Sequence, residues 1–153
     1  MFYYAYGANL NMDNMRYRCP NAQALCPMEL SDYRLCFRGV ADIEPCKGDV
    51  VHGALWKITK QCEKALDVFE GYPHLYSKRY FDVKFGGDLK RDFGEHNRVM
   101  VYVMNRKGYS YPSDAYVQTI AQGYEDFSLP VRSLIDTVQS TPSYSIYESK
   151  QWG

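Results

Sequence analysis

Hydrophobic and polar residues alternate with a period of two along several stretches of the chain, which is typical of strands with one buried face. At the end of a predicted strand at residues 22–37, Tyr33, Leu35 and Phe37 alternate with Arg34, Cys36 and the following Arg38. Gly39 interrupts this strand, and Gly48 with Asp49 is predicted to form a turn. Further strands are predicted, from alternation or from a continuous apolar run, at residues 2–5, 50–58, 76–85 and 98–105.

Other stretches follow the helical period of about 3.6 residues. Thr59 and Gly71 are residue types that begin and end helices, and they bracket a predicted helix at 60–70. Its apolar stripe consists of Cys62, Leu66 and Phe69. Residues 86–97 are charged and rich in glycine, which predicts a loop. Three more helices are predicted, at about 11–18, from 112 to between 123 and 127, and from 130 to about 139.

The order of elements is mostly strands with inserted and terminal helices. This order predicts an α+β fold rather than a doubly wound parallel sheet. A length of 153 residues suits one domain with a sizeable core. We therefore expect a single domain at residues 1–139 and a polar tail at 140–153, which is either docked or loose.

Charge and composition exclude several classes of function. Lys plus Arg and Asp plus Glu both total 18, so neither nucleic acid nor an anionic membrane is expected as a partner. No apolar stretch approaches the ~20 residues of a membrane span, and no leader-like start is evident. The five cysteines contain no C-x-x-C, and the three histidines have no metal-ligand spacing. We expect a cytoplasmic protein with reduced thiols and neither a metal nor a cofactor.

The first candidate site is the stretch 6–10, where a short aromatic strand runs through Gly7 into a helical segment. Unpaired backbone N–H groups at such a junction can bind a carboxylate or phosphate oxygen. Gly7 lacks a Cβ, so a ligand can lie against the main chain there. The alternative is an ordinary strand-to-helix turn in which Asn9 caps the helix.

The second candidate is Glu70, at the carboxyl end of the 60–70 helix. Unpaired carbonyls and nearby Asp67 both disfavour its ionisation, and burial acts in the same direction. A carboxyl group with a raised pKa can transfer protons at neutral pH. The alternative is that Glu70 is a solvated residue of a charged helix face. The 15 tyrosines fit a polar pocket, because each combines a packing surface with a hydrogen-bonding tip.

These segments resemble the γ-glutamylcyclotransferase-like proteins. Residues 6–10, Tyr-Gly-Ala-Asn-Leu, are similar to the family's Y-G-S-N-L loop. Residues 69–73, Phe-Glu-Gly-Tyr-Pro, together with Tyr76, resemble the segment that carries its catalytic glutamate. Residues 52–56, His-Gly-Ala-Leu-Trp, fit its G-x-L-[YW] strand. The C-terminal P-S-x-x-Y…G…L-P pattern is matched by Pro112, Ser113, Tyr116, Ile120, Gly123, Leu129 and Pro130.

The resemblance implies a small mixed β-barrel with flanking helices and a cavity at its mouth. It implies conversion of a γ-glutamyl amide to 5-oxoproline with release of the amine. Because the substrate's own α-amine attacks its γ-carbonyl, no enzyme nucleophile, metal or cofactor is required. Glu70 would be the general acid and base. The small-molecule substrate would be bound by Tyr6, Gly7, Ala8, Asn9, Leu10, Tyr76, Tyr102 and Tyr116.

Three functions remain open at this stage. The first is cyclisation of γ-glutamyl-amino acids or peptides, and the second is the same chemistry on γ-glutamyl amines or a γ-glutamyl protecting group. The third is a non-catalytic small-ligand binding protein on the same fold. Ala8 stands where the family commonly has Ser, so a hydroxyl contact from that position is absent here.

Overall fold

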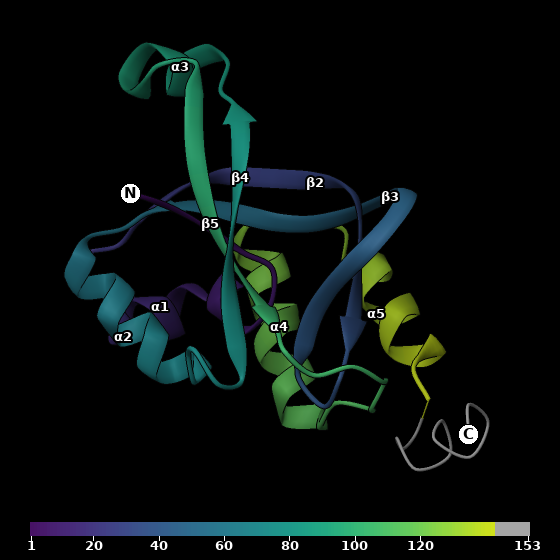
Figure 1. Ribbon diagram of the computed structural model, residues 1–153. Helices are drawn as coiled ribbons and strands as arrows, with labels where there is room; N and C mark the ends of the chain where they lie inside the picture. Colours follow the sequence, from purple (N-terminus) through teal and green to yellow (C-terminus); the bar gives the residue numbers. More distant parts are fainter. Residues whose placement is uncertain (143–153) are drawn as a thin grey trace.

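A five-stranded sheet in the order β2-β3-β1-β5-β4 forms the centre of the protein (Figure 1). The computed structural model describes residues 1–142. β1 is parallel to β5, and the other neighbouring strands are antiparallel. The strands are β1 (Phe2–Ala5), β2 (Gln23–Phe37), β3 (Ala41–Lys57), β4 (Tyr76–Lys84) and β5 (His96–Met104).

The α+β class is confirmed, but the sheet is not closed into a barrel. β2 and β4 are its two edges, and within residues 1–142 they share no hydrogen-bonded ladder. Their side chains nevertheless meet, because the rings of Tyr33 and Phe81 pack edge to face with centroids 5.4 Å apart. A cavity of about 560 Å³ is lined by residues of both edge strands, so side chains rather than backbone bonds span this gap.

The four helices predicted from the sequence are all present, with small differences at their ends. Thr59 accepts a hydrogen bond from the Cys62 N–H, and Gly71 ends the following helix with φ 67°, as its sequence predicts. The helical elements are the 3-10 turn η1 (Ala8–Leu10), α1 (Met12–Arg18), α2 (Lys60–Glu70), α3 (Gly87–Phe93), α4 (Asp114–Asp126) and α5 (Val131–Ser140).

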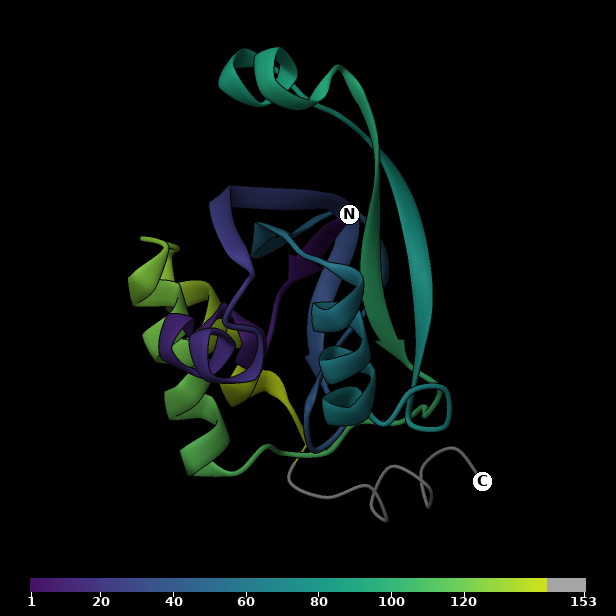
Figure 2. The ribbon, with the colours of Figure 1, turned by 90° about the vertical axis from the view of Figure 1, so that its left-hand side faces the viewer.

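Two local predictions are wrong. The predicted loop at 86–97 contains α3, a seven-residue helix with no fully buried residue, whose Leu89 and Phe93 are partly buried against the core. Figures 1 and 2 show α3 at the tip of the β4–β5 hairpin, away from the other helices. The predicted turn at Gly48 is instead a point inside β3, where the Gly48 N–H donates to Asp32 Oδ1 at 2.9 Å. Both residues have positive φ, 86° and 65°, beside a register shift between β2 and β3.

Packing of α4 against η1 fixes the position of the segment that follows β1. Gly123 of α4 lies directly on Leu10, so a Cβ at Gly123 would be 2.5 Å from the Leu10 Cβ. Leu10 is fully buried, which makes this contact part of the core. No helix within residues 1–142 combines the length and the apolar character that crossing a membrane requires. The predicted tail lies outside the described residues from 143 onward.

Candidate active site

A small pocket between β1, α2 and α4 gathers all the predicted site residues except Leu10. Its cavity has a volume of about 30 Å³, room for about two water molecules. The remaining lining side chains are Tyr3, Ala41 and Phe69, which the sequence analysis did not select. The predicted residues in the lining are Tyr6, Gly7, Ala8, Asn9, Glu70, Tyr76, Tyr102 and Tyr116.

Leu10 lies outside the pocket because its side chain is part of the hydrophobic core. Its side chain is buried against Gly123, and its N–H donates to the Gly7 carbonyl at 3.0 Å. The helix cap that the ordinary-turn alternative gave to Asn9 belongs to Asn11, whose Oδ1 accepts from the Asn14 N–H at 3.0 Å. The Asn9 side chain is therefore available to the pocket.

The chain after β1 presents its main chain to the cavity. A Cβ on Gly7 would lie 3.1 Å from the Ala41 Cβ and 3.4 Å from the Tyr116 hydroxyl, so only glycine fits without displacement. Hydrogen bonds formed within residues 1–142 do not engage the N–H groups of Ala8 and Asn9. Two backbone donors thus remain for an anionic group in the pocket.

Glu70 closes the opposite side of the pocket. Its Oε1 lies 3.3 Å from the Asn9 Nδ2, which donates to it. Burial raises the pKa of the Glu70 carboxyl to about 7, and the positive charge of Arg18 acts in the lowering direction. The expected contribution of Asp67 is not found, because Asp67 is held by Lys78 at 2.9 Å and by the Tyr102 hydroxyl at 2.6 Å.

Three of the pocket tyrosines donate hydrogen bonds from their hydroxyl groups to other groups of the protein. Tyr6 donates to the Tyr102 carbonyl at 2.6 Å, and Tyr76 donates to the Ala41 carbonyl at 2.7 Å. Tyr102 donates to Asp67, as described above. Burial raises the pKa of each of these phenols, so they are neutral at physiological pH.

Tyr3 and Tyr116 are placed differently, because their hydroxyl oxygens accept hydrogen bonds. Tyr3 accepts from the Asn9 Nδ2 at 3.0 Å, and Tyr116 accepts from the Ala41 N–H at 2.9 Å. Burial raises the pKa of both phenols, to about 12 for Tyr116. A phenol that accepts one hydrogen bond still has its own proton to donate, which suits it to bind developing negative charge.

Arg18 is a further residue that the sequence analysis missed. It ends α1, and its guanidinium stacks on the Phe69 ring with Cζ 3.4 Å from the ring centroid. Its Nη1 donates to the Asn9 Oδ1 at 2.5 Å. No local pattern distinguishes this arginine from its neighbours in the sequence, since its role depends on where α2 packs.

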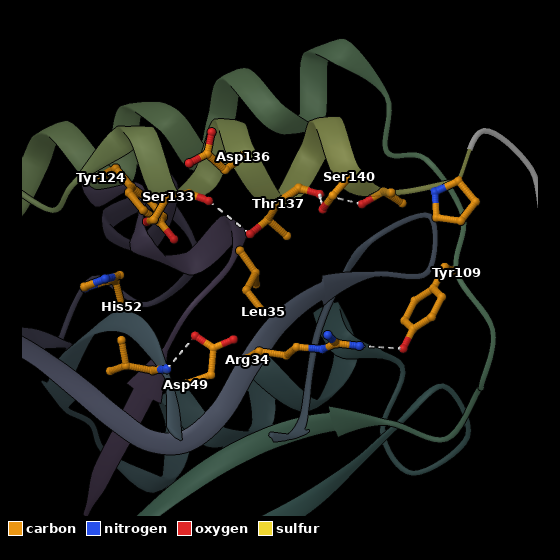
Figure 3. Close-up of a pocket in the computed structure, with 13 residues that line it drawn as sticks. Arg34, Leu35, Asp49, His52, Tyr109, Tyr124, Ser133, Asp136, Thr137 and Ser140 are labelled. Carbon is orange, nitrogen blue, oxygen red and sulfur yellow. Dashed lines mark hydrogen bonds between the residues drawn. The ribbon is translucent and has the colours of Figure 1, made fainter. Parts of the chain in front are cut away.

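A much larger cavity lies elsewhere, between the β2–β3 hairpin and α5 (Figure 3). It has a volume of about 650 Å³, and no predicted site residue lines it. Its walls include the side chains of Arg34, Asp49, His52 and Asp136; Arg34 reaches the Tyr109 hydroxyl at 3.1 Å and Glu44 at 2.6 Å. The Glu70 carboxyl with its raised pKa and the unengaged backbone N–H groups thus lie in the small pocket rather than in the large one.

The pocket residues lie within the part of the chain that is similar to known proteins. A family model described as gamma-glutamyl cyclotransferase, AIG2-like, matches residues 3–124, which include the whole lining of the small pocket. The chain belongs to this gamma-glutamyl cyclotransferase, AIG2-like family. The resemblance seen in the sequence is thereby confirmed, and the chain is an enzyme of the gamma-glutamylcyclotransferase kind.

Individual relatives agree with the family assignment. Gamma-glutamylcyclotransferase of Homo sapiens is 28% identical over 141 residues, which cover 84% of this chain and 72% of the human one. The Mus musculus gamma-glutamylcyclotransferase is 28% identical over 140 residues, with the same coverage. A solved structure named gamma-glutamyl cyclotransferase has a TM-score of 0.74 at 24% identity, covering 94% of this chain and 88% of that one. This solved structure and the present chain therefore have the same fold.

Proposed function

We propose that the protein converts a γ-glutamyl-amino acid or γ-glutamyl peptide to 5-oxoproline and releases the free amine. One observation carries this proposal: the Glu70 carboxyl, with its pKa raised to about 7, faces the unengaged N–H groups of Ala8 and Asn9 across the pocket. A group that can bind a carboxylate and a group that can move a proton are therefore both in the lining of one small pocket.

The reaction needs little more than these two groups. With the α-carboxylate bound by the N–H groups, the substrate's α-ammonium gives a proton to Glu70, and the freed amine attacks the γ-carbonyl carbon. The new C–N bond closes the five-membered ring. The old amide C–N bond then breaks as Glu70 returns the proton to the leaving nitrogen. The ring nitrogen gives up its second proton through the same carboxylate to the released amine, which leaves as an ammonium ion. Well-oriented intramolecular attack corresponds to effective molarities on the order of 10⁵–10⁸ M.

Tyr3 and Tyr116 are suited to stabilise the tetrahedral intermediate. Each hydroxyl keeps a proton that it can donate to the oxyanion, whereas the hydroxyl protons of Tyr6, Tyr76 and Tyr102 are engaged within the protein. The cavity of about 30 Å³ is smaller than a glutamyl group, so binding requires a lining side chain to move. Phe69, at the rim and 44% exposed, is the least confined of them.

The proposal is tested by incubating the protein with a panel of γ-glutamyl-amino acids, γ-glutamyl peptides and γ-glutamyl amines while 5-oxoproline is measured. Glu70→Gln is run beside the wild type, with Glu125→Gln, an exposed carboxyl on α4, as the matched control. We expect product from the wild type and the control, and a loss of roughly 10²–10⁴-fold in Glu70→Gln.

The panel also separates the alternatives. Preference for γ-glutamyl amines would assign the second function, in which only the leaving group differs. No product from any member, with ligand binding retained, would replace the proposal with a non-catalytic binding role. Turnover of Glu70→Gln equal to that of the control would remove Glu70 from the mechanism.

A further inference from the structure

Arg18 lies behind the pocket rather than in its lining. The half-buried guanidinium touches two lining residues, since it stacks on Phe69 and donates from Nη1 to the Asn9 Oδ1. Arg18 is therefore placed to act on the pocket through its neighbours. Any role in the reaction must be one of positioning and charge.

The contact with Asn9 fixes which end of the carboxamide faces Glu70. An arginine side chain has only hydrogen-bond donors, so it selects the amide oxygen. The Nδ2 end is then turned to the other side, where it donates to the Tyr3 hydroxyl at 3.0 Å and to the Glu70 Oε1 at 3.3 Å. The reversed amide would oppose two N–H groups to the guanidinium and an oxygen to the Glu70 carboxylate.

The charge of Arg18 acts directly on the same carboxyl. The groups that interact with Glu70 electrostatically come from five elements, and all but one are phenols that burial keeps neutral. They are Tyr3 and Tyr6 from β1 and the residue after it, Tyr76 from β4, Tyr102 from β5, Tyr116 from α4, and the cation Arg18 from α1. On α2 itself, Asp67 is paired with Lys78. Among residues 1–142, Arg18 is thus the charged group that opposes the effect of burial on Glu70.

We propose that Arg18 is a positioning residue of this site, which orients the Asn9 carboxamide toward Glu70 and supplies the counter-charge that lets the Glu70 carboxyl release its proton. The inference rests on the proposed role of Glu70. Both effects favour the carboxylate form, which is the form that accepts the proton of the substrate's α-ammonium. Without them, burial alone would hold the proton on Glu70 at neutral pH.

The test is a titration of the Glu70 carboxyl carbon by NMR in the substrate-free protein, with its signal assigned by its loss in Glu70→Gln. Arg18→Met keeps the apolar stem against Phe69 but removes the charge and the donors. Arg18→Gln removes the charge and keeps an amide donor, and Arg18→Lys keeps the charge. Arg16→Gln, on the exposed face of the same helix, is the matched control.

We expect the Glu70 midpoint near pH 7 in the wild type, in Arg16→Gln and close to it in Arg18→Lys. In Arg18→Met it should rise by about one pH unit or more, as expected for loss of a nearby opposite charge. Arg18→Gln should show the rise while leaving the Asn9 side-chain amide signals near their wild-type positions. If Arg18→Met does not fold, Arg18→Gln supplies the same comparison.

An unchanged midpoint in the folded uncharged variants would overturn the inference, because an arginine that only packs on Phe69 would leave the titration where it is. The measurement contains no substrate, so its outcome is independent of the 5-oxoproline assay. A failed assay with a shifted midpoint would reject the proposed function and keep the positioning effect. An active enzyme with an unshifted midpoint would keep the proposed function and reject the positioning role of Arg18.

Discussion

The Tyr102 hydroxyl donates a 2.6 Å hydrogen bond to the Oδ1 of Asp67, three residues before Glu70 in α2. The same Asp67 oxygen lies 2.9 Å from the Lys78 Nζ, which also reaches Glu63 at 2.8 Å. This chain of charge-assisted hydrogen bonds ties α2 to β4 and β5 beside the pocket. The helix end that carries Glu70 is therefore anchored by the strands that supply the pocket tyrosines.

Breaking this link should cost stability. Tyr102→Phe removes a hydrogen bond to a charged group and is expected to lower the free energy of unfolding by about 1–3 kcal/mol. Combined with Asp67→Asn in a double-mutant cycle, it should give a coupling energy of about 0.5–3 kcal/mol by chemical denaturation. Tyr80→Phe, on an exposed tyrosine of β4, is the control. Strictly additive effects would show that the two side chains do not cooperate.

Activity should depend on the protonation of Glu70. Below a pKa of about 7 the carboxyl is protonated and cannot accept the substrate's proton, so kcat/KM of the wild type should fall as pH decreases through that value. The measurement is a pH–rate profile with saturating and subsaturating substrate, with the small residual activity of Glu70→Gln as reference. A limb centred near 4.5, the ordinary value for a glutamate, would contradict the assignment.

The same carboxyl should make the protein less stable at alkaline pH. The unfolded chain loses the Glu70 proton near pH 4.5, whereas the folded chain keeps it until about pH 7, so the free energy of unfolding falls as pH rises between these values. Glu70→Gln removes this penalty. We expect it to be more stable than the wild type by roughly 1–3 kcal/mol at pH 8, and no more stable below about pH 4.5. Denaturant titrations at pH 4 and pH 8 provide the comparison, and equal stability at pH 8 would argue against a buried carboxylate.

The contact between α4 and η1 predicts a strong effect of a single methyl group. Gly123→Ala would place a Cβ 2.5 Å from the Leu10 Cβ and 2.6 Å from the Leu10 carbonyl carbon, so η1 must move. We expect a loss of about 1–3 kcal/mol in stability and lower turnover, because η1 carries the N–H groups of the site. Gly86→Ala has no neighbouring atom within 4 Å and serves as the control. Equal stability of the two variants would show that α4 does not constrain η1.

Several features of the fold were predictable from local sequence. The helix at 60–70 has a polar cap, an apolar stripe and a glycine with positive φ at its end, and all three are local signals. The helix α3 has only the last of them, Gly94 with φ 85°. Its cap makes no side-chain hydrogen bond, and its two apolar residues, Leu89 and Phe93, are only partly buried. The barrel was implied by the family resemblance, and closing it would require pairing between the two edge strands. Within residues 1–142, β2 and β4 share no ladder, and the rings of Tyr33 and Phe81, 48 positions apart, pack against each other.

The candidate site was predictable in its members but not in its geometry. The loop at 6–10 and Glu70 were selected from their local residues and from the family resemblance, yet the contact between Asn9 and Glu70 spans 61 positions. Arg18 was missed because its stacking on Phe69 exists only after α1 and α2 have packed together. The cause of the raised Glu70 pKa was also misjudged in part, since the neighbouring Asp67 is neutralised by Lys78 from another element.

The pocket joins parts of the chain that are made at very different times. The hydroxyl of Tyr6 is bound to the Tyr102 carbonyl across 96 positions, and Tyr116 completes the wall from a helix further on. The pocket is complete only when residues from Tyr3 to Tyr116 have folded together, so a ligand can bind the folded protein but not a shorter, incomplete chain. By mass action it therefore protects the protein as a whole against unfolding, by about 2.7 kcal/mol at one hundred times its Kd. Substrate supply and the lifetime of the folded enzyme are thereby linked.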